Sequence, residues 1–237
     1  MNEIESEVQK EPSFPSRVLR VFYSPRKVFE SLDRRPEWIW AALLGLVISL
    51  ALTFILLPRV FLPEHLAALR DNPDITPERL SAVEERFQGM LPTIMGLASA
   101  LFGFLVGLFG KSLVIFVAAL AFLSARAPFT KVLSVMAYSG FIGLLSYALK
   151  TPLMVAKGTR NIETSLAVFV SPDEGSKVVR GLLGSFDVFA IWELAIVSIG
   201  IGVIFKVTGK KAAMMVVPIW IVWRVLVSFL GSFAGRT

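Results

Sequence analysis

The sequence predicts an all-α membrane protein, a polytopic helix bundle with five transmembrane helices and short amphipathic helices at its surface. Three observations predict this class. Hydrophobic residues make up 55% of the 237 residues, and the mean hydropathy of +0.70 is far above that of a soluble globular chain. Five apolar stretches approach or exceed the length that crosses the ~30 Å hydrocarbon layer as a helix. Prolines and short basic turns separate several of these stretches.

Residues 1–37 form the predicted cytoplasmic N-terminal segment, and they lack the short apolar core of a removable signal peptide. Ser24 followed by Pro25 is typical of a helix start, because serine caps the first turn and proline fits its first position. The residues that follow place apolar and basic side chains on opposite faces. This pattern predicts an interfacial helix resting on the inner leaflet.

The predicted membrane domain covers residues 38–237. Its second apolar run, 91–123, would be ~50 Å long as a helix, too long for one untilted crossing and too short for two. We interpret it as one long span whose start projects from the lipid. The five predicted spans lie near 38–57, 91–123, 132–149, 188–205 and 212–230.

Two further proline steps, Thr76-Pro77 and Ser171-Pro172, predict helix starts between the spans. After each step apolar residues recur at intervals of three and four, which favours an amphipathic helix leading into the next span. For these helices, and for the one after Ser24, two interpretations are open. The helix either rests on the lipid surface or is an ordinary capped helix packed against the bundle.

The distribution of basic residues predicts a cytoplasmic N-terminus. The loops between the second and third spans and between the fourth and fifth are also basic and free of acids, so they are expected on the same side. An odd number of spans then places the C-terminus on the opposite side. Six basic residues lie between positions 17 and 35, close to the first span: Arg17, Arg20, Arg26, Lys27, Arg34 and Arg35.

Two opposite charges lie inside the last two predicted spans, Glu193 and Arg224. A charge at the centre of a membrane helix costs about 2.5–3.5 kcal/mol on insertion scales, so each needs a partner, water or the interface. Counted from the predicted span ends, both lie ~9 Å below the same outer surface. The sequence therefore predicts an intramembrane ion pair between them. The alternative is that Arg224 extends alone to the interface while Glu193 is protonated or close to headgroups.

The third charge inside a span, Lys111, continues a ridge of small residues that lets another helix pack closely. The ridge consists of Ser99, Gly103 and Gly107. On this interpretation Lys111 points into the bundle, where it shares Glu193 or faces a polar cavity beside Tyr138 or Tyr147. The excess positive charge would then suit a phosphate or carboxylate, as an anion or lipid contact. The alternative is that the lysine only extends its stem to the interface.

The sequence offers no catalytic, cofactor or metal site. It has no cysteine and one histidine, His65, and no aspartate lies within a span. Thiolate metal sites and the paired aspartates of intramembrane hydrolysis are therefore not expected. The net charge of +6 comes from bases beside apolar runs, which suits lipid headgroups rather than nucleic acid. The expected partners are membrane lipids, and either other proteins or further copies of this chain.

The stretches FYSPRKVFESLDRRPEWIWAALL, from residue 22, and FDVFAIWELAIVSIGIGVIFKVTGKKAAMMVVPIWIVW, from residue 186, carry a family resemblance. They include the Phe22-x-x-Pro25 opening and the Asp187-x-Phe189-x-x-Trp192 entry to the fourth span. The chain resembles the Yip family, membrane proteins that interact with Ypt/Rab GTPases. The resemblance implies five spans and a cytoplasmic N-terminus. It also links eukaryotic members to Rab recruitment and ER–Golgi vesicle traffic.

The chain departs from this family by lacking a long soluble N-terminal region, where partner binding is usually placed. The short tail, the absence of cysteine and the absence of N-x-[ST] glycosylation sequons favour a bacterial cytoplasmic membrane. The leading hypothesis is a non-enzymatic membrane protein that acts through membrane organisation, trafficking-like roles or partner recruitment. The alternative is a transporter, channel or lipid scramblase that uses the intramembrane charges.

Overall fold

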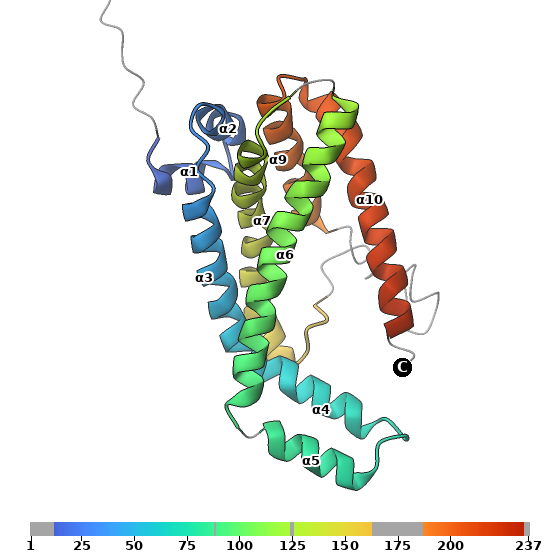
Figure 1. Ribbon diagram of the computed structural model, residues 1–237. Coiled ribbons are helices and arrows are strands. Elements are labelled where there is room, and N and C mark those ends of the chain that lie inside the picture. The colour runs from blue at the N-terminus through green and yellow to red at the C-terminus, as the bar shows by residue number, and fades with distance from the viewer. Residues whose placement is uncertain (1–11, 88, 124–125, 163–186, 235–237) are drawn as a thin grey trace, which may run out of the picture.

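The computed structural model describes residues 12–87, 89–123, 126–162 and 187–234, with side chains to residue 226 (Figure 1). The regular elements in these ranges are all helices, which confirms the predicted all-α class. Long helices run side by side as a bundle, with short helices across both of its ends. The predicted Ser171-Pro172 helix start lies outside the described residues.

Two short helices, α1 (Phe14–Arg20) and α2 (Pro25–Arg34), form an N-terminal layer across one end of the bundle (Figure 1). The predicted start of α2 is correct, with Ser24 before the first turn and Pro25 within it. The apolar face of α2 is fully buried against α7 and α9. For this helix, therefore, the apolar face packs on protein and the charged face points outward.

The first long helix, α3 (Ile39–Leu56), does not end the helical stretch at Pro58, which directly follows the predicted span 38–57. It continues through a π-helical turn, η1 (Leu57–Phe61), into α4 (Leu62–Arg70). The wider π turn accommodates a proline that cannot donate a backbone hydrogen bond. Figure 1 shows α4 leaving the bundle at an angle from this point.

The helix α5 (Pro77–Phe87) begins at the predicted Thr76-Pro77 step, where the Thr76 hydroxyl accepts a hydrogen bond from the Arg79 amide at 3.4 Å. It packs beside α4 at the end of the bundle opposite the N-terminal layer (Figure 1). An ion pair of 2.5 Å between Arg70 and Glu84 joins the two helices. Because both partners are partly solvated, this pair adds at most about 1 kcal/mol.

Four helices complete the bundle: α6 (Leu91–Phe122), α7 (Phe129–Lys157), α9 (Val188–Ile204) and α10 (Gly209–Ala234). The predicted span 132–149 lies within the longer α7. In the described residues three helical stretches are long and apolar enough to cross a membrane: Ile39–Arg70, Leu91–Phe122 and Phe129–Lys157. The 17-residue α9 is a shorter apolar helix. The count of five crossings stays a prediction.

The centre of the fold is α7, since half of its most apolar window is buried, against 22% for α6. The main core lies where α7 and α9 cross beneath α2. Gly200 on α9 permits this crossing, because a Cβ at this position would lie only 2.5 Å from Cγ1 of Val135 and 3.0 Å from Cε2 of Phe29. A larger residue at 200 would force these helices apart.

We expect Gly200→Leu to destabilise the protein by about 1–3 kcal/mol, because it overpacks the crossing of α2, α7 and α9. The matched control is Gly103→Leu on α6, where an added Cβ meets nothing within 4 Å. Thermal unfolding in mild detergent, followed by tryptophan fluorescence, measures both variants. Equal melting temperatures for the two variants would contradict the packing argument.

Candidate functional site

A cavity of about 430 Å³ lies between α6, α7, α9 and α10, and we call it the intramembrane cavity. Its walls are mostly apolar, but Lys111, Glu193 and Arg224 all border it, as does Asp187 at the start of α9. The structure thus gathers the three charges that the sequence singled out within the spans. They come from three different helices.

The predicted Glu193–Arg224 ion pair is not formed, since no ion pair within 4.0 Å joins these two side chains in the described part of the chain. Counted from the turn that joins α9 and α10, Glu193 lies ~16 Å along one helix and Arg224 ~22 Å along the other. The two residues are therefore offset by about one helical turn. They interact electrostatically across the cavity without direct contact.

Among the cations, Lys111 attracts the Glu193 carboxylate most strongly. Gly143 on α7 makes room for the carboxylate, because a Cβ there would lie 3.2 Å from Oε2 of Glu193. Lys111 borders the cavity, as the inward interpretation requires, although its side chain remains exposed. The sharing of Glu193 by Lys111 stays a prediction, since no ion pair within 4.0 Å joins the two side chains among the described residues.

Neither tyrosine predicted beside Lys111 lines the intramembrane cavity. Tyr138 is fully buried in the core, with its ring edge-on to Phe14 and Phe141. Tyr147 packs against a separate apolar cluster that includes Met154. Sequence alone did not fix which face of α7 meets α6.

The small-residue ridge on α6 does not pack against another helix among the described residues. Ser99 and Gly103 are exposed, and a Cβ added at Gly103 or Gly107 would meet nothing within 4 Å. Gly107 instead borders the intramembrane cavity together with Gly110. The ridge therefore leaves open space rather than a close helix contact.

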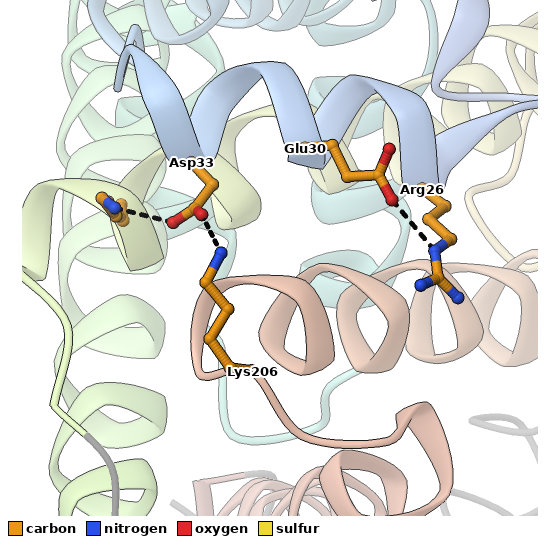
Figure 2. Close-up of polar contacts among 5 residues, drawn as sticks. Arg26, Glu30, Asp33 and Lys206 are labelled. Atoms are coloured by element: carbon orange, nitrogen blue, oxygen red, sulfur yellow. Dashed lines mark hydrogen bonds and ion pairs between the residues drawn. The ribbon is translucent and has the colours of Figure 1, made fainter.

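The structure also contains an ion-pair cluster that the sequence analysis missed, centred on Asp33 of α2 (Figure 2). Its carboxylate accepts a hydrogen bond of 2.6 Å from Lys131 at the start of α7, and another from Lys206 at the end of α9. Burial alone would raise the pKa of Asp33, but the two lysines outweigh it and hold the pKa below its ordinary value of 3.8. The carboxylate is therefore ionised at neutral pH and ties three helices together.

The backbone at Lys206 adjoins this cluster in an unusual conformation. Its φ of 55° is left-handed, and the amides of Lys206 and Val207 donate to the carbonyls of Val203 and Gly202. These two hydrogen bonds form a Schellman motif, in which glycine is the usual left-handed residue. Here a lysine occupies that position and reaches Asp33. Neither pattern nor spacing signals such a contact, since 173 residues separate the partners.

A second, partly buried charge pair fixes the other end of α9. Asp187 caps the helix by accepting a hydrogen bond of 2.7 Å from the Ala190 amide, and it also accepts one of 2.8 Å from Lys150 of α7. Burial acts to raise the pKa of Asp187, but Lys150 and the helix amides lower it overall. The family-like Asp187-x-Phe189-x-x-Trp192 step is thus a capped and anchored helix start.

Comparison with known families gives one decisive finding, a match to the Yip1 domain over residues 19–231. The chain belongs to the Yip1 family. The match confirms the resemblance drawn from the two end stretches, and it runs from α1 into α10, so both ion-pair clusters lie within the Yip1 domain. No curated protein and no solved structure matches the chain.

We expect the two lysines of the Asp33 cluster to contribute unequally. Lys131 is 23% exposed and Lys206 is 71% exposed, while Asp33 is 12% exposed. Lys131→Gln should therefore destabilise the Yip1 domain by about 1.5–3 kcal/mol, and Lys206→Gln by about 1 kcal/mol or less. Hydrogen exchange of the α2 amides and thermal unfolding measure both variants. A larger effect at Lys206 would contradict this assignment.

Proposed function

We propose that the protein is a non-enzymatic integral membrane protein of the Yip1 type that recruits a partner or organises the membrane at its cytoplasmic face. It would cross the membrane five times, with the N-terminal layer in the cytoplasm. The family match and the long apolar helices support a membrane protein of this class. The features of the α2 end of the bundle support the recruiting role.

A groove of about 720 Å³ runs along this end, and we call it the cytoplasmic groove. Arg26 and Glu30 of α2 form one wall, and the turn from α9 to α10 forms the other, with Lys206 and Thr208. Figure 2 shows Arg26 and Glu30 paired on the same side of α2 as Asp33, and their ion pair measures 3.0 Å. The walls of the cytoplasmic groove thus combine charged groups with apolar residues such as Val203, as partner-binding surfaces do.

The single observation that carries the proposal is the Asp33 cluster, because it fixes both walls of the groove. Asp33 lies on α2, and its partner Lys206 is itself a wall residue on the opposite side. A surface held rigid before binding loses little conformational entropy when a partner docks. The ion pairs of this cluster perform no reaction, so their role is to hold the two walls of the groove in position.

We expect a photoreactive side chain in place of Glu30, on the groove wall, to cross-link one discrete partner in native membranes. The matched control places it at Glu85, an exposed acid of α5 at the other end of the bundle. Lys131→Gln should weaken the cross-link at position 30, because it loosens α2. The measurement is gel analysis and mass spectrometry of the products. The same product at both positions, or none at position 30, would refute recruitment through the groove.

The second candidate is a transporter, channel or lipid scramblase, which the charged lining of the intramembrane cavity favours. The cavity and the cytoplasmic groove share no lining residue, which supports the recruiting role over a transport path. Reconstitution into vesicles tests this, with ions, small solutes and labelled lipid as probes. We expect no flux above that of empty vesicles. Flux that disappears in Glu193→Ala but persists in Glu85→Ala would overturn the scaffold role.

A further inference from the structure

The intramembrane cavity contains an arginine whose binding capacity is incompletely used. Nε of Arg224 is buried and has no hydrogen-bond partner among the described residues. The guanidinium lies 5.8 Å from the ring centre of Trp220, which is a cation–π distance. A buried donor without an acceptor costs about 1–3 kcal/mol, so this site favours a bound acceptor.

The nearby acids are already engaged with other cations. Asp187, which attracts Arg224 most strongly, accepts from Lys150 at 2.8 Å. Glu193, the next acid, is most strongly attracted to Lys111. Two bases and two acids line the cavity, and Lys150 lies outside its lining. Counting all five groups leaves one net positive charge among the described residues, and we assign it to Arg224. The complementary ligand carries one negative charge.

The rest of the cavity suits a hydrocarbon chain. Its remaining walls are largely apolar, and Gly107 and Gly110 leave open space along α6. The helices α6 and α10 lie together at the α2 end and diverge toward the other end (Figure 1). Cavity residues near this divergence, Val106 and Trp223, are about half exposed, so the cavity is open to the surrounding lipid.

The depth of Arg224 matches a headgroup. It lies ~22 Å along α10 from the turn at the α2 end, which in a ~30 Å hydrocarbon layer is ~8 Å below the opposite surface. An arginine at this depth reaches the phosphate level with its long side chain. Trp220 and Trp223 beside it are residues that membrane proteins place near the interface.

We propose that the intramembrane cavity binds one anionic phospholipid from the leaflet at the Asp187 end. The Arg224 guanidinium would hold the phosphate, with the planar two-donor geometry that arginine offers this group. An acyl chain would lie along Gly107 and Gly110. This site goes beyond the recruiting role, since it lies in a separate cavity and stands whether or not the groove binds a partner.

The test uses the full chain, purified in mild detergent and titrated with phosphatidylglycerol or phosphatidylcholine under native mass spectrometry. We expect one phosphatidylglycerol to bind more tightly than phosphatidylcholine, and Arg224→Gln to weaken it by roughly tenfold or more. Arg86→Gln removes an exposed cation from α5 at the same end and should change nothing. Thermal unfolding checks that each variant is folded.

A second pair of variants tests the acyl chain and does not depend on Arg224. Gly107→Leu fills the cavity, whereas Gly103→Leu adds the same side chain to α6 outside it. We expect only Gly107→Leu to weaken phosphatidylglycerol binding, and only this variant to lose quenching of tryptophan fluorescence by phosphatidylglycerol with brominated chains. Equal behaviour of the two variants would overturn the acyl-chain placement.

Three outcomes would overturn the lipid site itself. Phosphatidylglycerol would bind Arg224→Gln as tightly as the unchanged protein, or phosphatidylcholine would bind as well as phosphatidylglycerol. In the third, inorganic phosphate at millimolar concentration would displace phosphatidylglycerol with the same dependence on Arg224, which would identify a site for free phosphate instead. Retained phosphatidylglycerol selectivity in the presence of phosphate supports the proposal.

Discussion

The hydrogen-bonded carboxylate of Asp33 is the interaction on which the arrangement of the α2 end depends. It is the one acidic group, among the described residues, that contacts both α7 and α9 from the N-terminal layer. The apolar face of α2 supplies most of the binding energy for this layer, because area burial is the larger effect. Burial of apolar area is not directional, however, whereas hydrogen bonds are. The two lysines therefore determine the position in which α2 lies. The charged contacts therefore set the orientation of α2, and its apolar face supplies most of the free energy that holds it against the bundle.

The fold class and most helix starts were predictable from sequence, because they follow from local patterns. Ser24-Pro25 and Thr76-Pro77 each start a helix, because proline fits the first turn in both. The Thr76 hydroxyl also caps its helix, whereas Ser24 makes no side-chain cap hydrogen bond. Pro58 does not end its helical stretch, because a π-helical turn accommodates it. Pro152, inside α7, also fails to end its helix. Proline predicts a weak point in the backbone hydrogen bonding, and the surrounding packing determines whether the helix ends there.

Sequence reasoning singled out three charged residues that border one cavity, but it did not predict their geometry. A charge inside a membrane helix is costly unless it has a partner or a polar cavity, and Glu193, Arg224 and Lys111 border one cavity. The direct pairing failed because a shift of four residues at a helix end moves a side chain by about one turn. The contacts of Asp33 were beyond pattern reading, since partners 98 and 173 residues away leave no periodic trace. Tertiary packing alone brings such groups together.

The lysine at the left-handed position between α9 and α10 affects two properties separately: the strain in the turn and the attachment of the N-terminal layer. A glycine at 206 would adopt φ of 55° without the cost of about 1 kcal/mol that a side chain carries there. It would also lose the partly solvated bond to Asp33, worth a similar amount. The two effects would nearly cancel in the stability of the whole chain, while the N-terminal layer would lose one of its two charged attachments. This position lets the chain alter how firmly its N-terminal layer is held, at almost no cost in total stability.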